Sequence, residues 1–225
     1  MEKDRSLMHR LMAEAAAKGD AVLWFNELYR QSGDDLDLIP WADLEPNPQL
    51  AKWLEREKPD GVGKTALDVG CGLGDNAEHL AQFGFTVTAF DVAPGAIEWC
   101  HKRFPTTRID YLVANALEMP QEWSGRFDFV HECYTLQTLP EELRPQAMAE
   151  LARCMKPGGT LLIICRGRDD GEAYDKTDLP WPLSRNELDR FTTMGFELIR
   201  YEDFMDMESK PKRRIRAEYR KSGSV

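Results

Sequence analysis

The chain has 225 residues, of which 42% are apolar and 30% charged, a composition typical of a globular protein with one well-cored domain. Its 39 acidic and 29 basic side chains give a net charge of −10, which argues against general nucleic-acid binding, because that function needs a basic surface. No stretch approaches 18 apolar residues and the start of the chain is polar, so neither a membrane span nor a secretion signal is expected. Five scattered cysteines and four histidines without ligand spacing predict reduced thiols, a cytoplasmic protein and no metal site.

The first part of the chain is predicted to be helical. Two helices are expected, over residues 4–18 and 20–31, and a loop rich in Asp and Pro follows them. Asn47 as cap and Pro48 in the first turn predict a third, shorter helix. We expect residues 1–58 to form a helical lid on the unit 59–225, within one compact domain.

From Lys64 onward, strand-like and helix-like stretches alternate. The predicted strands cover residues 65–69, 86–91, 109–114, 127–131 and 160–165, with helices near 75–83, 94–104 and 140–155. This alternation is typical of a parallel sheet with helices on both faces. A capping box at Ser184 predicts one more helix, and the strand-like runs 196–206 and 212–220 predict an antiparallel pair at one edge of the sheet. The basic residues Lys210, Lys212, Arg213, Arg214 and Arg216 are interpreted as the solvated face of the last strand.

A glycine-rich loop follows the first of these strands and carries the clearest functional signal. Gly70, Gly72 and Gly74 stand between an apolar strand and a helix, a layout that lets a ligand approach the backbone closely. Asp68 precedes them, and Asp91 ends the next strand, where a carboxylate accepts hydrogen bonds from both hydroxyls of a ribose. The sequence therefore predicts a nucleoside-containing ligand.

The residue after the third glycine separates two classes of ligand. A dinucleotide motif needs a small residue at position 75, whereas Asp75 places a negative charge where a pyrophosphate would bind. The G-x-G-x-G spacing with an acid upstream resembles the first motif of class I S-adenosylmethionine-dependent methyltransferases. The resemblance implies a Rossmann-like seven-stranded sheet of order 3-2-1-4-5-7-6, S-adenosylmethionine as cofactor with S-adenosylhomocysteine as product, and no metal. The alternatives are a nicotinamide-dependent oxidoreductase and a non-catalytic cofactor-binding protein.

The same resemblance assigns further cofactor contacts to the ends of later strands. Asn115 stands where the family commonly has an Asp that contacts the adenine amine, although it is also a residue that caps turns. His131, Glu132 and Tyr134 follow the fourth strand, where the family places cofactor and substrate contacts. The expected cofactor-binding residues are Trp24, Trp41, Asp68, Gly70, Gly72, Gly74, Asp91, Val92, Asn115, Ala116, Leu117, His131 and Glu132.

The N-terminal segment suggests a subfamily. Trp24 and Trp41, with their aromatic and proline-rich neighbours, resemble the lid of thiopurine, thiol and halide methyltransferases. In those families such aromatic residues cover the cofactor and wall the substrate pocket. The alternative for both Trp side chains is ordinary packing of N-terminal helices on the sheet. The resemblance favours a small-molecule acceptor, with no nucleic-acid or membrane partner.

The acceptor is expected to be a thiol, because a thiolate is accessible near neutral pH and needs no strong base. Arg166 and Arg168, just after the fifth strand, are candidates to stabilise such an anion or a substrate carboxylate. His131 or Tyr134 would take a proton from a hydroxyl acceptor, which keeps O-methylation of a small phenol or carboxylate as the alternative. His131, Tyr134 and Arg166 are the predicted catalytic residues, and the assembly is expected to be a monomer or a homodimer.

Overall fold

A computed structural model describes residues 5–20, 22–207 and 211–223. Residue 4 and Ala21 of the predicted N-terminal helices, and Lys210 of the predicted basic face, lie outside these ranges. Within them, no helix is both long enough and apolar enough to cross a lipid bilayer.

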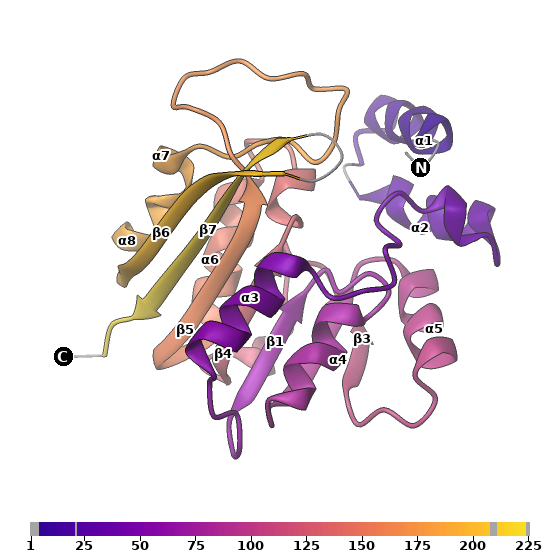
Figure 1. Ribbon diagram of the computed structural model, residues 1–225. Coiled ribbons are helices and arrows are strands. Elements are labelled where there is room, and N and C mark those ends of the chain that lie inside the picture. The colour runs from indigo at the N-terminus through magenta and orange to yellow at the C-terminus, as the bar shows by residue number, and fades with distance from the viewer. Residues whose placement is uncertain (1–4, 21, 208–210, 224–225) are drawn as a thin grey trace.

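One seven-stranded sheet forms the centre of the fold, in the order β3-β2-β1-β4-β5-β7-β6 (Figure 1). The strands are β1 (Thr65–Val69), β2 (Thr86–Asp91), β3 (Asp110–Val113), β4 (Phe127–Cys133), β5 (Met155–Arg166), β6 (Phe196–Asp206) and β7 (Lys212–Lys221). The first five strands pair in parallel, and β7 pairs antiparallel with both β5 and β6. The sequence-based prediction of strand order and edge hairpin is confirmed.

Helices cover both faces of the sheet (Figure 1). They are α1 (Ser6–Ala17), α2 (Leu23–Ser32), α3 (Pro48–Glu57), α4 (Asp75–Gln82), α5 (Pro94–Arg103), α6 (Arg144–Cys154), α7 (Arg185–Leu188) and α8 (Arg190–Thr193), with short 3-10 turns η1 (Leu36–Leu38), η2 (Gln121–Trp123) and η3 (Leu136–Thr138). One buried apolar cluster joins α3, α4 and α5 to the sheet, and another joins η2, α6, α7 and α8 to its other face. Because all five parallel strands end at one edge, their following loops meet there.

Two local predictions need correction. The strand β5 begins at Met155 rather than at residue 160, and Gly158 with φ 76° lies inside an irregular stretch where the register against β4 shifts. The basic residues of β7 do not form a solvated face, since Arg214 and Arg216 are 6% and 7% exposed. Arg216 donates to Glu202 and to the carbonyl of Gln49 in α3. Both faces of β7 are covered, so the six consecutive residues from Arg214 to Tyr219 are buried, which composition alone does not reveal.

The N-terminal helices α1 and α2 lie beside the carboxyl edge of the parallel strands (Figure 1). Met8, Leu11 and Trp24 are buried in a separate apolar cluster that includes Leu179 from the long segment after β5. The third helix, α3, packs instead on the face of the sheet with α4. Within the segment 1–58, α3 is thus set apart from α1 and α2, and the lid stays a prediction for the part of the segment before α3.

Candidate active site

The glycine loop after β1 is held by contacts that exclude larger side chains. Gly70 and Gly72 have φ values of 62° and 53°, in the left-handed region that favours glycine. A Cβ atom on Gly70 would lie 2.2 Å from Oγ1 of Thr135, which donates to the carbonyl of Val69 at 2.9 Å. A Cβ atom on Gly72 would lie 3.4 Å from the ring of Trp41. The loop thus packs against both the segment after β4 and the N-terminal segment.

Asp91 fixes this loop to the end of β2. Its two carboxylate oxygens accept hydrogen bonds from the backbone N–H groups of Gly72 and Ala93, both at 3.0 Å. The side chain is buried, and burial raises its pKa to about 6 despite those hydrogen bonds. Asp91 therefore lies at the predicted position beside the glycine loop, with a charge that a ligand's donors would stabilise.

Asp75 does not have the role inferred from the sequence. Its carboxylate forms a bidentate ion pair with Arg103 of α5, both distances being 2.6 Å. Arg103 also donates to the carbonyl of Leu73. The charge of Asp75 is therefore matched by a residue 28 positions away, and it braces the glycine loop instead of facing a ligand.

Two further carboxylates are buried at the ends of β1 and β4. Oδ1 of Asp68 lies 2.7 Å from Nδ1 of His131, and its Oδ2 atom, like Nε2 of His131, is buried without a hydrogen-bond partner. Glu132 accepts from the backbone N–H groups of Thr135 and Leu136 with one oxygen, while its other oxygen has no partner. Burial raises the pKa of Glu132 to about 7. Asp68, Asp91 and Glu132 together make this edge of the sheet strongly electronegative.

These groups fit S-adenosylmethionine. The cofactor carries a sulfonium and an ammonium cation, and buried carboxylate oxygens without partners are costly unless a cation or a donor reaches them. Asp68 and Glu132 offer such oxygens, and Asp91 offers acceptors for ribose hydroxyls. No group of three His, Cys, Asp or Glu side chains placed to hold a metal occurs among the described residues.

The predicted adenine contacts follow β3. Asn115 accepts from the backbone N–H of Leu117 at 2.9 Å, so its side chain caps a turn, as the alternative interpretation stated. Ala116 is buried, whereas Leu117 and, after β2, Val92 are half-buried. An amide oxygen can accept a second hydrogen bond, so the adenine contact of Asn115 stays a prediction.

Aromatic side chains of the N-terminal segment gather over the glycine loop. Trp41 donates from Nε1 to the hydroxyl of Tyr29 at 2.8 Å, and its ring packs edge-on against Trp24. Trp24 also stacks on Phe25 and is buried in the apolar cluster with Met8 and Leu179, and its contact with the cofactor stays a prediction. Tyr29 is a residue that the sequence analysis missed. Its only signal was its place in the same aromatic helix as Trp24.

Tyr134 has an unusual backbone at the end of β4. Its φ of 65° is rare for a residue with a side chain, and such outliers concentrate at functional sites. Its hydroxyl accepts from the side-chain amide of Asn47 at 3.4 Å, and the guanidinium of Arg214 lies 5.1 Å from its ring centroid. Tyr134 therefore joins β4, β7 and the start of α3 at the carboxyl edge.

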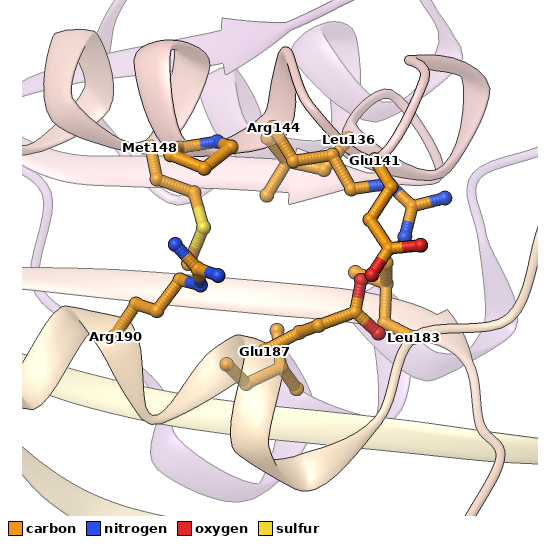
Figure 2. A pocket seen from close by; sticks show the side chains of 9 residues that line it. Leu136, Glu141, Arg144, Met148, Leu183, Glu187 and Arg190 are labelled. Atoms are coloured by element: carbon orange, nitrogen blue, oxygen red, sulfur yellow. The ribbon is translucent and has the colours of Figure 1, made fainter. Parts of the chain in front are cut away.

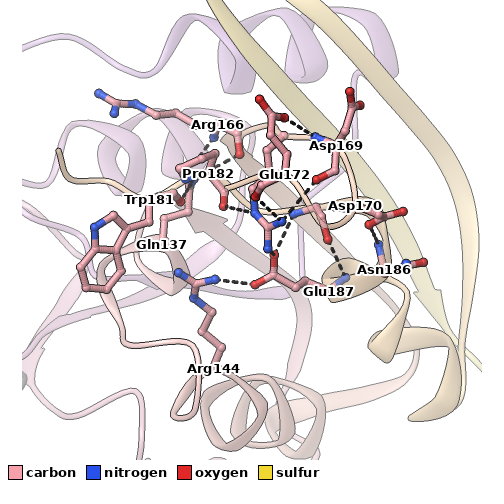
Figure 3. Close-up of polar contacts among 12 residues, drawn as sticks. Gln137, Arg144, Arg166, Asp169, Asp170, Glu172, Trp181, Pro182, Asn186 and Glu187 are labelled. Carbon is pink, nitrogen blue, oxygen red and sulfur yellow. Dashed lines mark hydrogen bonds and ion pairs between the residues drawn. The ribbon is translucent and has the colours of Figure 1, made fainter. Parts of the chain in front are cut away.

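Arg166, the last residue of β5, and Arg168, two residues later, have different partners. Figure 3 shows that the side chain of Arg166 points away from Glu187. Arg168 belongs to a polar network, because it donates to Glu187 at 2.7 Å and to the carbonyls of Glu172 and Pro182. Arg166 points away from this network and binds Asp178 and the carbonyl of Pro180. Arg166 thus stays a candidate for acceptor binding, and Arg168 is explained by its structural contacts.

The hollows beside that network lie on the α6 side of the segment after β5. A cavity of about 20 Å³, room for about one water molecule, is lined by Arg144, Glu187 and Arg190 among others (Figure 2). An open groove of about 480 Å³ next to it shares Glu187 and Arg190. None of the predicted cofactor or catalytic residues lines either hollow.

Comparison with known proteins agrees with the predicted fold. Residues 66–159 match a protein family described as a methyltransferase domain, and this range runs from β1 into β5. The chain is 34% identical over 125 residues to a ubiquinone biosynthesis O-methyltransferase of Pseudomonas paraeruginosa. The aligned stretch covers 55% of this chain and 53% of the relative. It is 29% identical over 153 residues to a 2-heptyl-1-hydroxyquinolin-4(1H)-one methyltransferase of Mycobacteroides abscessus. This aligned stretch covers 66% of the chain and 64% of that relative. The chain spans about half the length of the first of these relatives.

The solved structures define the fold class. A methyltransferase of Methanosarcina mazei that depends on S-adenosylmethionine superposes with a TM-score of 0.66 at 18% identity, over 80% of this chain and 100% of the other. The Rossmann-like methyltransferase fold predicted from the sequence is confirmed. The match of residues 66–159 to a methyltransferase domain agrees with the predicted enzyme class.

Proposed function

We propose that this protein transfers a methyl group from S-adenosylmethionine to a small molecule, and that the acceptor is a thiol. The observation that carries the first part is the set of three buried carboxylates, Asp68, Asp91 and Glu132, around the glycine loop. Such a site is unfavourable for a phosphate and favourable for a cationic nucleoside. A cytoplasmic enzyme, either a monomer or a homodimer, with no nucleic-acid or membrane partner, is part of the same proposal.

Different side chains of the site have different roles in such a reaction. S-adenosylmethionine, when bound, would supply an electrophilic methyl group, which a nucleophile attacks in line while S-adenosylhomocysteine leaves as the thioether. Asp68 and Glu132 balance its positive charge, and Asp91 orients its ribose. Trp41 and Tyr29, packed over Gly72, exclude water and restrict the acceptor to a compact molecule.

A thiol acceptor is consistent with the surroundings of Arg166. This guanidinium is mostly buried, with its side chain 12% exposed, and its charge would attract an acceptor that carries a thiolate or a carboxylate. A thiol loses its proton near neutral pH, so the reaction needs no strong base. The same group would stabilise the anion while the acceptor is brought into line.

A hydroxyl acceptor is the second candidate, and two observations favour it. One relative is named as an O-methyltransferase of ubiquinone biosynthesis. In addition, the buried pair Asp68–His131 has the geometry of a general base that a carboxylate orients, with Nε2 of His131 left without a partner. In that case His131 or Tyr134 would take the hydroxyl proton.

A panel assay for S-adenosylhomocysteine release tests the proposal. Thiols, phenols, amines, carboxylates and halides are compared, together with thermal melting in the presence of S-adenosylhomocysteine or NAD. We expect S-adenosylhomocysteine to raise the melting temperature and thiols to be the best acceptors, with rates that rise with pH and level off near the thiol's own pKa. Equal protection by NAD would refute the methyltransferase proposal, whereas activity confined to phenols or carboxylates would refute only the thiol assignment.

A further inference from the structure

We propose that the methyl acceptor carries a carboxylate separate from its reacting atom, and that Arg166 and Lys212 bind this carboxylate at the lid end of β5 and β7. The inference rests on the proposed function, because it concerns the acceptor side of the same site. It names a substrate class that the acceptor panel alone does not define.

Four basic side chains come together from three elements. Arg166, the last residue of β5, pairs across the sheet with Arg214 of β7. Lys212 lies two residues before Arg214 and therefore on the same face of β7. Arg5, at the start of α1, reaches the same place from the lid, since it shares the carboxylate of Asp178 with Arg166.

Among the described residues, Asp206 lies 4.0 Å from Arg214, and Asp178 is the carboxylate in ion-pair contact with Arg5 and Arg166. Asp178 lies 2.9 Å from Arg5 and 3.2 Å from Arg166, and its own side chain is 56% exposed. In the part of the chain that the structure describes, Lys212 makes no ion pair, and Nε of Arg166 is buried without a hydrogen-bond partner. Arg5 and Arg166 thus share one surface carboxylate, and Lys212 lies near enough to feel the charges of all three groups. Burial and the like charges nearby lower the pKa of both Arg166 and Lys212, which shows that an added anion would be stabilised there.

The cluster is joined directly to the end of β4. The side-chain oxygen of Gln137 accepts from the backbone N–H of Arg166 at 2.7 Å. The guanidinium of Arg214 lies over the ring of Tyr134, which follows Glu132 by two positions. The carboxylates on β1, β2 and β4 and the cations on β5, β7 and α1 therefore lie side by side along one edge of the sheet. A cationic methyl donor and an anionic acceptor would be oriented toward each other by this separation of charge.

Asp178 indicates that a carboxylate is the kind of anion that this cluster of basic side chains binds. It is a carboxylate, it comes from the long segment after β5, and it already bridges Arg166 and the lid residue Arg5. A carboxylate on the acceptor would use the unpaired Nε of Arg166 and the ammonium of Lys212. The competing explanation is that the cations only hold the N-terminal segment in place through Asp178. In that case, a carboxylate on a ligand would not increase its affinity.

Matched acids and esters test the inference. We would titrate 4-mercaptobenzoate, 4-hydroxybenzoate and their methyl esters into the protein, with and without S-adenosylhomocysteine, and measure equilibrium binding by calorimetry. The wild-type protein is expected to bind each acid about tenfold or more tightly than its ester, because charge-assisted hydrogen bonds are the stronger kind. Lys212→Gln and Arg166→Gln are each expected to reduce this ratio about tenfold.

Arg220→Gln is the matched control. Arg220 lies at the opposite end of β7 and is exposed, and its side chain donates to the carbonyl of Gly158. It should leave the acid-to-ester ratio unchanged. Equal binding of acid and ester by the wild-type protein, no binding of either acid, or an unchanged ratio in Lys212→Gln would overturn the inference. Melting with S-adenosylhomocysteine in the same samples tests the proposed function separately, because that readout does not involve the acceptor.

Discussion

Asp68 and His131 lie opposite each other on neighbouring parallel strands, and their side chains meet at 2.7 Å in the buried edge of the sheet. Each keeps one polar atom without a partner, Oδ2 of Asp68 and Nε2 of His131. A buried pair that is only partly satisfied is costly for stability alone. Because the pair lies beside the glycine loop, we expect a bound ligand to supply hydrogen-bond or charge partners for these two atoms.

Asp68→Asn tests whether this carboxylate recognises charge. The amide still accepts a hydrogen bond from His131 but no longer carries a charge toward the cofactor. We expect the affinity for S-adenosylmethionine to fall by about 10- to 100-fold, as for loss of a charged hydrogen bond. The affinity for 5′-methylthioadenosine, which lacks both cations, should fall much less. Titration of both ligands gives the comparison.

Asp128→Asn serves as the control for that substitution. Asp128 lies near the amino end of β4, where it binds Lys156 at 2.7 Å, far from the carboxyl edge. It should change neither affinity. An equal loss for both ligands in Asp68→Asn would mean that the glycine loop has collapsed and that no charge is recognised.

Asp91→Ala should weaken cofactor binding and also reduce stability. The substitution removes the acceptors of the Gly72 and Ala93 N–H groups, which are buried. Leaving buried donors unpaired costs roughly 1–3 kcal/mol of unfolding free energy, and loss of the ribose contact should raise the dissociation constant at least tenfold. Urea unfolding and titration with S-adenosylhomocysteine measure the two effects. Asp110→Ala, an exposed carboxylate at the start of β3, should alter neither, and unchanged cofactor affinity in folded Asp91→Ala would show that the ribose lies elsewhere.

Much of the fold was predictable from local sequence, because it depends on patterns that repeat along the chain. Apolar runs of strand length, Pro94 in a first helical turn and the capping box of Ser184 identify elements without knowledge of their partners. The positive φ values of Gly70, Gly72 and Gly74 also agree with the predicted loop. These features are decided by neighbours within a few positions.

The errors concern contacts between distant positions. Asp75 appeared to face a ligand because Arg103, which neutralises it, lies 28 positions later. The basic residues of β7 appeared solvated because their partners are on α3 and β6. Tyr29 and the pair Asp68–His131 likewise depend on how elements meet in space. Sequence spacing locates a strand end, whereas tertiary packing decides which side chains share it.

Burial of Glu132 and Asp91 predicts a specific pH dependence of stability. Their pKa values of about 7 and about 6 exceed the ordinary values of 4.5 and 3.8, so the folded state binds more protons than the unfolded chain over roughly pH 5–8. The free energy of unfolding should therefore fall as pH rises through this window, by roughly 2–3 kcal/mol from Glu132. Cofactor affinity should rise over the same range, because the ionised carboxylates attract its cations.

Glu132→Gln is the variant that isolates this effect. Glutamine keeps an oxygen that can accept from the Thr135 and Leu136 N–H groups but does not ionise. Urea unfolding at pH 5.5 and pH 8 should show a smaller decrease for the variant than for the wild-type protein. The same pH dependence in both proteins would mean that Glu132 titrates at its ordinary value.

The lid proposal predicts that Trp41 matters for turnover more than for stability. Trp41→Ala removes the ring that packs on Gly72, which would admit water and loosen the acceptor, so kcat/KM should fall about tenfold or more. Tyr29→Phe removes only the hydrogen bond to Trp41 and should have a smaller effect. Rates of S-adenosylhomocysteine release, compared with melting temperatures, separate the two contributions. A loss of rate that merely follows the loss of stability would contradict the lid.

The position of α1 changes the expectation for a truncated protein. In the sequence, residues 1–20 precede the aromatic motif of Trp24 and Trp41, which predicts that their removal matters less than the loss of Trp41. In the structure, Met8 and Leu11 of α1 are buried with Trp24 and Leu179, and Arg5 binds Asp178. Removing residues 1–20 exposes that apolar cluster and releases the segment after β5. We therefore expect the truncation to lower kcat/KM to a similar degree as Trp41→Ala while S-adenosylhomocysteine binding persists, because the carboxylates around the glycine loop belong to the sheet.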